Sequence, residues 1–323
     1  MDRDTLLKAA EQGIISKQQA ELLADFDATG ISSDSENSEE QLRFIRSFGD
    51  IFITLGIIFV SIATAQFEIN GLYKIIPVVI LVATTEWLVR RRRLALPGIA
   101  LLIATLYYSS QFIGLSKPDF ELSNIAIPTV VALLFYWRYR MPFTLLPIAL
   151  GLLSMVTVLL DIDIKNAQLF IVIYGLMVFA VAMWFDSRDI KRQTRLSDAA
   201  FWLHLLAAPL VVHGVMVTLL VETQSIPFRE LLIIIFFSAF FLIALFVDRR
   251  AILVSSISYA IYAIVELARS NQIQIENITL LIFVGFGVFI IVFGVYWYKI
   301  RSFLFSNMSH WAISRYVPAL KRN

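Results

Sequence analysis

The 323-residue chain is 59% hydrophobic and only 16% charged, with a mean hydropathy of +0.76. A soluble globular domain carries about 25% charged residues, so the composition argues against such a domain and indicates a polytopic membrane protein. The formal net charge of +2 selects no class of partner, and the chain has no cysteine, which excludes disulfides, thiolate metal sites, iron–sulfur clusters and cysteine nucleophiles.

The first part of the chain, residues 1–27, predicts a cytoplasmic hairpin of two short amphipathic helices. Gly13 is expected to end the first helix as a C-cap, and Ser16 with Gln19 to open the second as a capping box. Such a hairpin buries little surface by itself, so we expect it to bind a protein partner, its own membrane domain or a second copy. Residues 28–42 are polar and acidic and predict a flexible linker.

The region 43–298 predicts a membrane domain, because a bilayer core of about 30 Å needs roughly 20 mostly apolar residues per helix. The segments of that kind number about ten, and they fall at 48–66, 73–89, 95–114, 123–138, 143–160, 168–185, 199–221, 230–247, 251–268 and 278–298. The predicted fold class is therefore an all-α polytopic bundle of about ten transmembrane helices.

The distribution of Lys and Arg supports this count through the positive-inside rule. With both termini in the cytoplasm, the inner side holds 22 of these residues and the outer loops hold 5. The expected location is a bacterial inner (plasma) membrane. The tail, 299–323, mixes aromatic and basic residues and predicts a basic amphipathic segment at the cytoplasmic interface, although a frayed basic terminus would have the same composition.

A short pattern recurs where the even-numbered helices reach the cytoplasm: "EWLVRRRR", "FYWRYR", "MWFDSRD" and "LFVDRR". One interpretation is four stacked helical hairpins flanked by the first and tenth helices. The other is that aromatic belts and inner-side arginines produce such a pattern at any inner boundary.

The order of these parts resembles uncharacterised bacterial multi-pass predicted membrane proteins that carry an N-terminal helical hairpin. The stretches that bear the resemblance are "LLKAAEQGIISKQQAELLADF", "FGDIFITLGIIFV", the closing "RSFLF" and "VPAL", and "RLSDAAFWLHLLAAPLVVH". The resemblance implies an inner-membrane location. It transfers no activity and no catalytic residue.

The candidate intramembrane polar site consists of four ionisable residues that lie away from the predicted boundaries: Glu86, His204, His213 and Glu266. Each is costly to bury in a bilayer and is therefore a candidate functional residue. The two histidines are nine residues apart, which places them on opposite faces of one helix. Depth along the helices pairs His204 with Glu86 and His213 with Glu266, and these two pairs would form a two-step proton path.

An alternative is that each histidine only donates to a carbonyl or hydroxyl of a neighbouring helix, as buried polar groups must. Asp186, Asp198 and Asp248 lie at predicted helix ends beside arginines, where ordinary salt bridges would explain them, and Asp198 could also cap its helix. The hydroxyls of "LYYSSQF" are expected to join helices, and Gly285, Gly287 and Gly294 to permit close packing.

The motifs of common enzymes, HExxH, GxxxxGK[ST] and a membrane GxSx with a partner histidine, do not occur. These absences narrow the possible enzymes and leave a lipid-modifying enzyme as a third hypothesis, after the two given below. We expect no metal site, no cofactor and no nucleic-acid partner; the expected surroundings are the lipid bilayer. The favoured function is a carrier or channel-like protein for a small solute or protons. The alternative is a non-transporting membrane scaffold or regulator that recruits a partner through residues 1–27.

Overall fold

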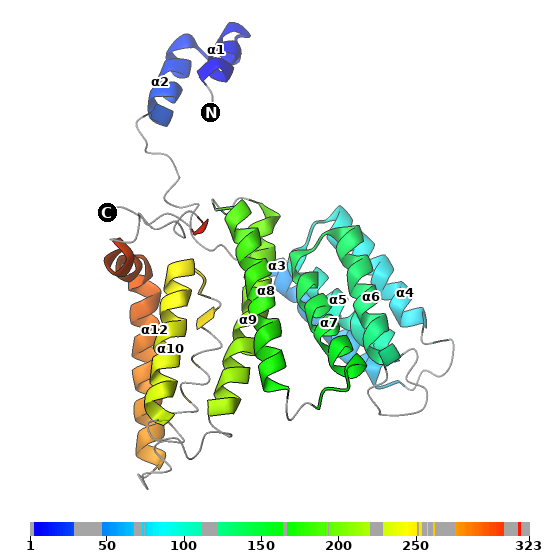
Figure 1. The fold of residues 1–323 in the computed structure, drawn as a ribbon. Helices are drawn as coiled ribbons and strands as arrows, with labels where there is room; N and C mark the ends of the chain where they lie inside the picture. Colours follow the sequence, from blue (N-terminus) through cyan, green and yellow to red (C-terminus); the bar gives the residue numbers. More distant parts are fainter. Residues whose placement is uncertain are drawn as a thin grey trace.

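Helices form all the regular structure in the described part of the computed structural model, which contains no strand (Figure 1). The all-α fold class is therefore confirmed. The structure describes residues 3–28, 47–67, 73, 75–111, 122–163, 167–190, 192, 194–219, 229–250, 252–253, 257, 261, 275–306 and 316–317.

The N-terminal hairpin has the two predicted helices, α1 (Arg3–Glu11) and α2 (Lys17–Ala28). Gly13 has a φ of 71° and ends α1, as expected for a left-handed C-cap. The amide of Ser16 donates to Gln19 Oε1 (2.9 Å) and the amide of Gln19 donates to Ser16 Oγ (3.1 Å), so the capping box is confirmed.

The remaining helices follow the predicted spans closely. In chain order they are α3 (Phe48–Ala65), α4 (Ile75–Thr85) with a π-helical turn η3 (Glu86–Arg91), α5 (Ala95–Gln111), α6 (Leu122–Tyr139), η4 (Pro142–Thr144) with α7 (Leu145–Leu159), α8 (Gln168–Arg188), α9 (Arg195–Val217), α10 (Arg229–Val247) and α12 (Ile275–Phe305). The ninth predicted span, 251–268, lies mostly outside the described residues.

Five of the described helices are long and apolar enough to cross a membrane. They are Phe48–Ala65, Pro142–Leu159, Gln168–Arg188, Arg195–Val217 and Phe283–Phe305. The helices at Ala95–Ser110 and Ile235–Val247 are apolar but shorter.

The pair α8 and α9 lies at the centre of the helices that follow the N-terminal hairpin (Figure 1). One apolar cluster packs α9 against α10 and α12, and a second packs α7, α8 and α9 together. In the most apolar 18-residue stretch of α9, 56% of the residues are buried. The buried share of the corresponding stretch is at most 17% in each of the other four long helices. α9 is therefore the central helix of the described fold.

Glycine allows α8 and α9 to approach closely. A Cβ added at Gly214 would lie 2.5 Å from Val172 Cγ2 and 2.9 Å from the carbonyl oxygen of Gln168. A Cβ at Gly175 would lie 2.9 Å from Val211 Cγ2. All three distances are too short to admit a Cβ, so Gly175 and Gly214 set the spacing between the two helices.

The glycines expected to permit close packing in the last helix behave differently. A Cβ added at Gly285, Gly287 or Gly294 would meet no described atom within 4 Å. The ninth predicted span lies mostly outside the described residues, so close packing at these glycines stays a prediction. The predicted role of the hydroxyls in "LYYSSQF" is confirmed at Tyr108, whose hydroxyl contacts Thr64 Oγ1 and donates to the carbonyl of Ser61 on α3.

The four hairpin turns that carry the recurring sequence pattern share a backbone feature. Arg93, Arg140, Arg192 and Asp248 have φ values of 57°, 50°, 52° and 61°, one in each turn. A positive φ is uncommon outside glycine, and belts of aromatic and basic side chains do not require it. The recurrence favours four related helical hairpins; Asp161 at the end of α7 also has a positive φ (49°).

The last helix is longer than its hydropathy predicts. α12 continues past the predicted end at residue 298 to Phe305. It therefore includes the first residues of the predicted tail. Arg301 in this extension is buried, and so is Trp297 just before it.

Candidate functional site

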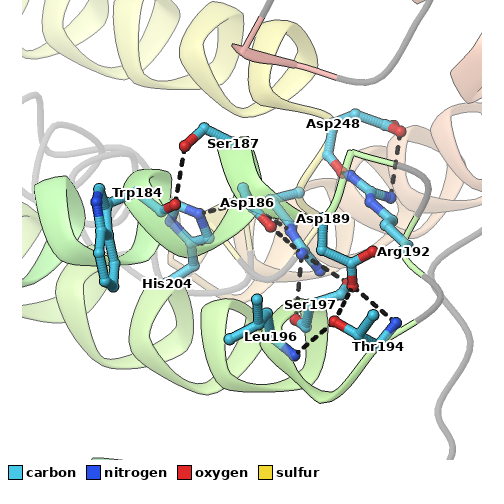
Figure 2. A network of polar contacts seen from close by, with 11 residues as sticks. Trp184, Asp186, Ser187, Asp189, Arg192, Thr194, Leu196, Ser197, His204 and Asp248 are labelled. Carbon is cyan, nitrogen blue, oxygen red and sulfur yellow. Dashed lines mark hydrogen bonds and ion pairs between the residues drawn. The ribbon is translucent and has the colours of Figure 1, made fainter.

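Polar and charged side chains gather near the α8–α9 turn, where α8 ends and α9 begins (Figure 2). Residues at the ends of α10 and α12 belong to the same group, and all these side chains are almost fully buried. We name them the charged cluster. Its members are Asp186, Asp189, Arg192, Ser197, His204, Asp248, Arg249, Trp297 and Arg301. The aspartates and arginines balance, so with a neutral imidazole the cluster has no net formal charge.

Asp186, one turn before the end of α8, is the centre of the cluster. Its Oδ2 lies 2.9 Å from His204 Nε2 on α9 and accepts from Arg249 Nε at 3.1 Å. Its Oδ1 accepts from Arg249 Nη2. The guanidinium and the carboxylate thus meet through two parallel bonds, the arrangement that makes arginine–carboxylate pairs strong and directional.

Arg249 reaches this site from just beyond the end of α10 and is only 1% exposed. Its Nη2 also donates to Ser197 Oγ (3.1 Å) and to the carbonyl oxygen of Ser197 (3.2 Å). One buried cation therefore holds together α8, the first turn of α9 and the end of α10.

His204 is fully buried and packs against the ring of Phe179. An ionised carboxylate can only accept hydrogen bonds, so His204 Nε2 must donate to Asp186. The other ring nitrogen, Nδ1, is then the position at which the imidazole would take up a proton.

A second ion pair joins the α8–α9 turn to α10 and α12. Arg192 Nη1 lies 3.3 Å from Asp248 Oδ2, and its Nη2 donates to the carbonyl of Asp248 at 2.6 Å. Trp297 Nε1 on α12 donates to Asp248 Oδ1 at 2.7 Å. Arg192 and Asp248 both have left-handed backbones, which turn the chain back at these two positions.

Two further sets of hydrogen bonds hold the α8–α9 turn and the ends of α10 and α12 in place. Asp189 Oδ2 accepts from the amide and the hydroxyl of Thr194, at 2.8 and 2.7 Å, and so closes the α8–α9 turn. Arg301 donates to the carbonyls of Leu245 and Phe246 in the last turn of α10. Helices end with unsatisfied carbonyl groups, and a buried arginine at this place satisfies two of them.

Three of the four predicted site residues are described, and the structure places His204 and Glu86 with different partners. His204 is bound to Asp186 and not to Glu86, so the predicted pair is wrong. Glu86 lies in the π-helical turn with its side chain 36% exposed, and it bonds to Arg90 (2.6 Å) and Arg138 (2.7 Å). The depth argument failed because the sixth predicted span, 168–185, left Asp186 outside the helix, whereas α8 continues to Arg188.

The structure describes only one member of the second predicted pair, His213 with Glu266. His213 is exposed on α9, whereas His204 is buried, in agreement with the opposite faces that their spacing predicts. Glu266 lies outside the described residues, and its pairing with His213 stays a prediction.

The predicted salt bridges of the helix-end aspartates are confirmed for Asp186 and Asp248. The cap of α9 is Thr194, whose side chain accepts from the amide of Leu196 at 3.2 Å, and not Asp198, which lies in the first turn. The sequence did not reveal that Asp186 and Asp248 are buried and that each binds side chains from more than one other part of the helical domain. The acid before arginine in "MWFDSRD" and "LFVDRR", absent at that place in the other two motifs, was the available signal.

Within the described ranges, no group of three or more histidine, aspartate or glutamate side chains could hold a metal ion. Comparisons of the chain with protein-family models, curated proteins and solved structures find no match.

Proposed function

We propose that the chain is an inner-membrane protein of about ten spans with both termini in the cytoplasm. The five long apolar helices support this, and so does the distribution of Lys and Arg. The helices also expose large apolar side chains along their lengths, such as Phe59 on α3 and Phe283 and Val295 on α12. Continuous apolar surface of this kind suits contact with lipid.

Within that membrane domain, we propose that the protein is a carrier or channel-like protein for a small solute or protons. The observation that carries this proposal is the charged cluster, buried among helices of which three are long enough to span a bilayer. Buried ion pairs add little stability compared with well-packed apolar residues. Ionisable groups inside membrane helices commonly mark solute and proton pathways.

The position of the cluster suits a gate on the cytoplasmic side. Its two ion pairs, Asp186 with Arg249 and Arg192 with Asp248, join α8 and α9 to the end of α10. A passage that opens between these helices on that side must separate charges that are now paired. A solute or a proton that supplies a replacement partner would make this separation possible.

Purified protein in liposomes that enclose a pH-sensitive dye would test the proposal. Imposed pH gradients, and then gradients of carboxylates, amino acids, sugars and inorganic ions, are applied one at a time. A change of internal pH that requires the protein supports transport. Traces identical to those of protein-free vesicles under every condition would contradict it.

The scaffold alternative has its own supporting observation. The hairpin of α1 and α2 buries Leu6 and Ala20 but leaves Leu7, Leu22 and Leu23 exposed. Exposed apolar residues on a short hairpin are typical of a surface that binds another protein. A protein that co-purifies with the wild type and is lost in a Leu22→Glu/Leu23→Glu variant, together with absence of flux, would favour the scaffold.

A further inference from the structure

The guanidinium of Arg249 is already arranged to hold a carboxylate. It presents Nε and Nη2 side by side to the two oxygens of Asp186. Ser197 adds two oxygens next to Nη2 and so fixes the orientation of the guanidinium plane. Any small carboxylate that replaced Asp186 could make the same two bonds.

Asp186, for its part, already has a second partner. Its Oδ2 is shared between His204 Nε2 and Arg249 Nε, at 2.9 and 3.1 Å. If His204 were protonated, the imidazolium would be a full counterion for this carboxylate. The bond between them is formed already, so Asp186 would need no new partner on losing Arg249.

Charge balance links the protonation of His204 to the replacement of Asp186 by a carboxylate on Arg249. The charges of Asp186 and Arg249 cancel, so this part of the cluster is neutral when the imidazole of His204 carries no charge. The remaining charges of the cluster, Asp189, Arg192, Asp248 and Arg301, also cancel. A proton on His204 alone would leave one uncompensated positive charge in a buried site, which is costly. A proton together with one monoanion leaves the net charge at zero.

We propose that Arg249 is the binding site of a small carboxylate monoanion, which takes the place of Asp186 on the guanidinium when His204 takes up a proton. This inference rests on the proposed transport function and names its substrate class. A hydronium ion of the surrounding water loses one O–H bond as the proton forms a bond with His204 Nδ1, and a water molecule is left. No electron is transferred. Asp186 moves from the pair with Arg249 to the pair with the imidazolium.

The coupling between proton and anion must be reciprocal at equilibrium. A bound carboxylate raises the pH at which His204 takes up its proton, and a lower pH raises the affinity for the carboxylate by the same factor. Formate is the appropriate probe because it is the smallest carboxylate. A site that accepts a larger carboxylate also admits formate.

The chain has only three histidines, so NMR of ¹⁵N-histidine-labelled protein in detergent can follow each imidazole. The His204 signal is assigned by its loss in a His204→Gln variant. With saturating formate, we expect its titration midpoint to move upward by about one pH unit or more, a coupling of roughly tenfold. An unchanged midpoint, or the same shift in an equal concentration of chloride, would overturn the proposal.

Two internal controls sharpen the result. The NMR signal of the exposed His213 should not respond to formate. Arg249→Lys keeps the charge but removes the two-pronged donor, so the formate-dependent shift of His204 should disappear. A shift that persists in this variant would place the carboxylate elsewhere.

The titration does not depend on transport, so the two proposals can fail separately. Formate-linked titration without flux in vesicles would contradict transport and leave the anion site standing. Flux without formate-linked titration would contradict the anion site and leave transport standing.

Discussion

Asp186 and Glu86 each lie near the end of the first helix of a hairpin, and each bonds two nitrogen-bearing side chains at short distance. Asp186 contacts His204 and Arg249, and Glu86 contacts Arg90 and Arg138. The difference is burial: Asp186 is 6% exposed, whereas the Glu86 side chain is 36% exposed. Bond lengths alone would rank the two sites as equals.

The comparison shows that burial decides how much the loss of one member of an ion pair costs in stability. The side chains of Arg90 and Arg138 are 58% and 38% exposed, so water can replace Glu86 as their partner. Arg249 is 1% exposed and has no such replacement. Only in the buried pair does loss of one member leave an uncompensated charge.

Asp186→Asn should have the largest effect on stability. It leaves the Arg249 guanidinium buried without its carboxylate, and we expect a loss of about 3–5 kcal/mol in the free energy of unfolding. Thermal unfolding of the purified protein in detergent measures this. The matched control is Asp161→Asn, in an exposed turn, which should unfold like wild type.

The double variant Asp186→Asn/Arg249→Gln shows whether charge is the cause. It removes both members of the pair and should recover part of the loss, since neutral partners leave no buried charge. A double variant less stable than Asp186→Asn would show that shape, and not charge, explains the first result.

Trp297→Phe should have a smaller effect. It removes the indole N–H that donates to Asp248 Oδ1 but keeps an aromatic ring in the buried position. We expect a loss of about 1.5–3 kcal/mol, the range for a hydrogen bond to a charged group. Trp137→Phe is the control, because Trp137 is 77% exposed. Equal melting temperatures for the two variants would contradict the role assigned to Trp297.

Gly214→Ala tests the close approach of α8 and α9. The added methyl group would lie 2.5 Å from Val172 Cγ2, so α8 and α9 must separate, at an expected cost of about 1–3 kcal/mol. Gly294→Ala meets no described atom within 4 Å and should be neutral or stabilising. If both substitutions change the melting temperature alike, the contact does not set the helix spacing.

Glu86→Gln should have the smallest effect. Its ion pairs lie at the surface, where water replaces them. The melting temperature should match that of wild type at low and at high salt. A loss as large as that of Asp186→Asn would mean that Glu86 is buried by something other than this chain.

The helices were largely predictable because long apolar runs in a membrane protein have few alternative structures. Gly13, Ser16 and Gln19 defined the hairpin for a similar reason, since their capping bonds are local in sequence. The asymmetry between His204 and His213 followed from helical periodicity alone.

The charged cluster could not be derived in the same way. Its bonds connect residues far apart in the sequence, such as Asp186 with Arg249 and Arg192 with Asp248. They depend on where the helices end, and an error of a few residues at the end of α8 moved Asp186 out of the span. Hydropathy places helix centres well and helix ends poorly, and this cluster lies at the ends.

Proton movement by the His204→Gln variant in liposomes tests most directly whether the charged cluster carries transport. A glutamine amide can still donate to Asp186, so the fold should be kept, but it cannot take up a proton near neutral pH. The proton-coupled flux should fall to the level of protein-free vesicles, while Glu86→Gln keeps the wild-type rate. A His204→Gln protein that moves protons at the wild-type rate would contradict the role of the cluster.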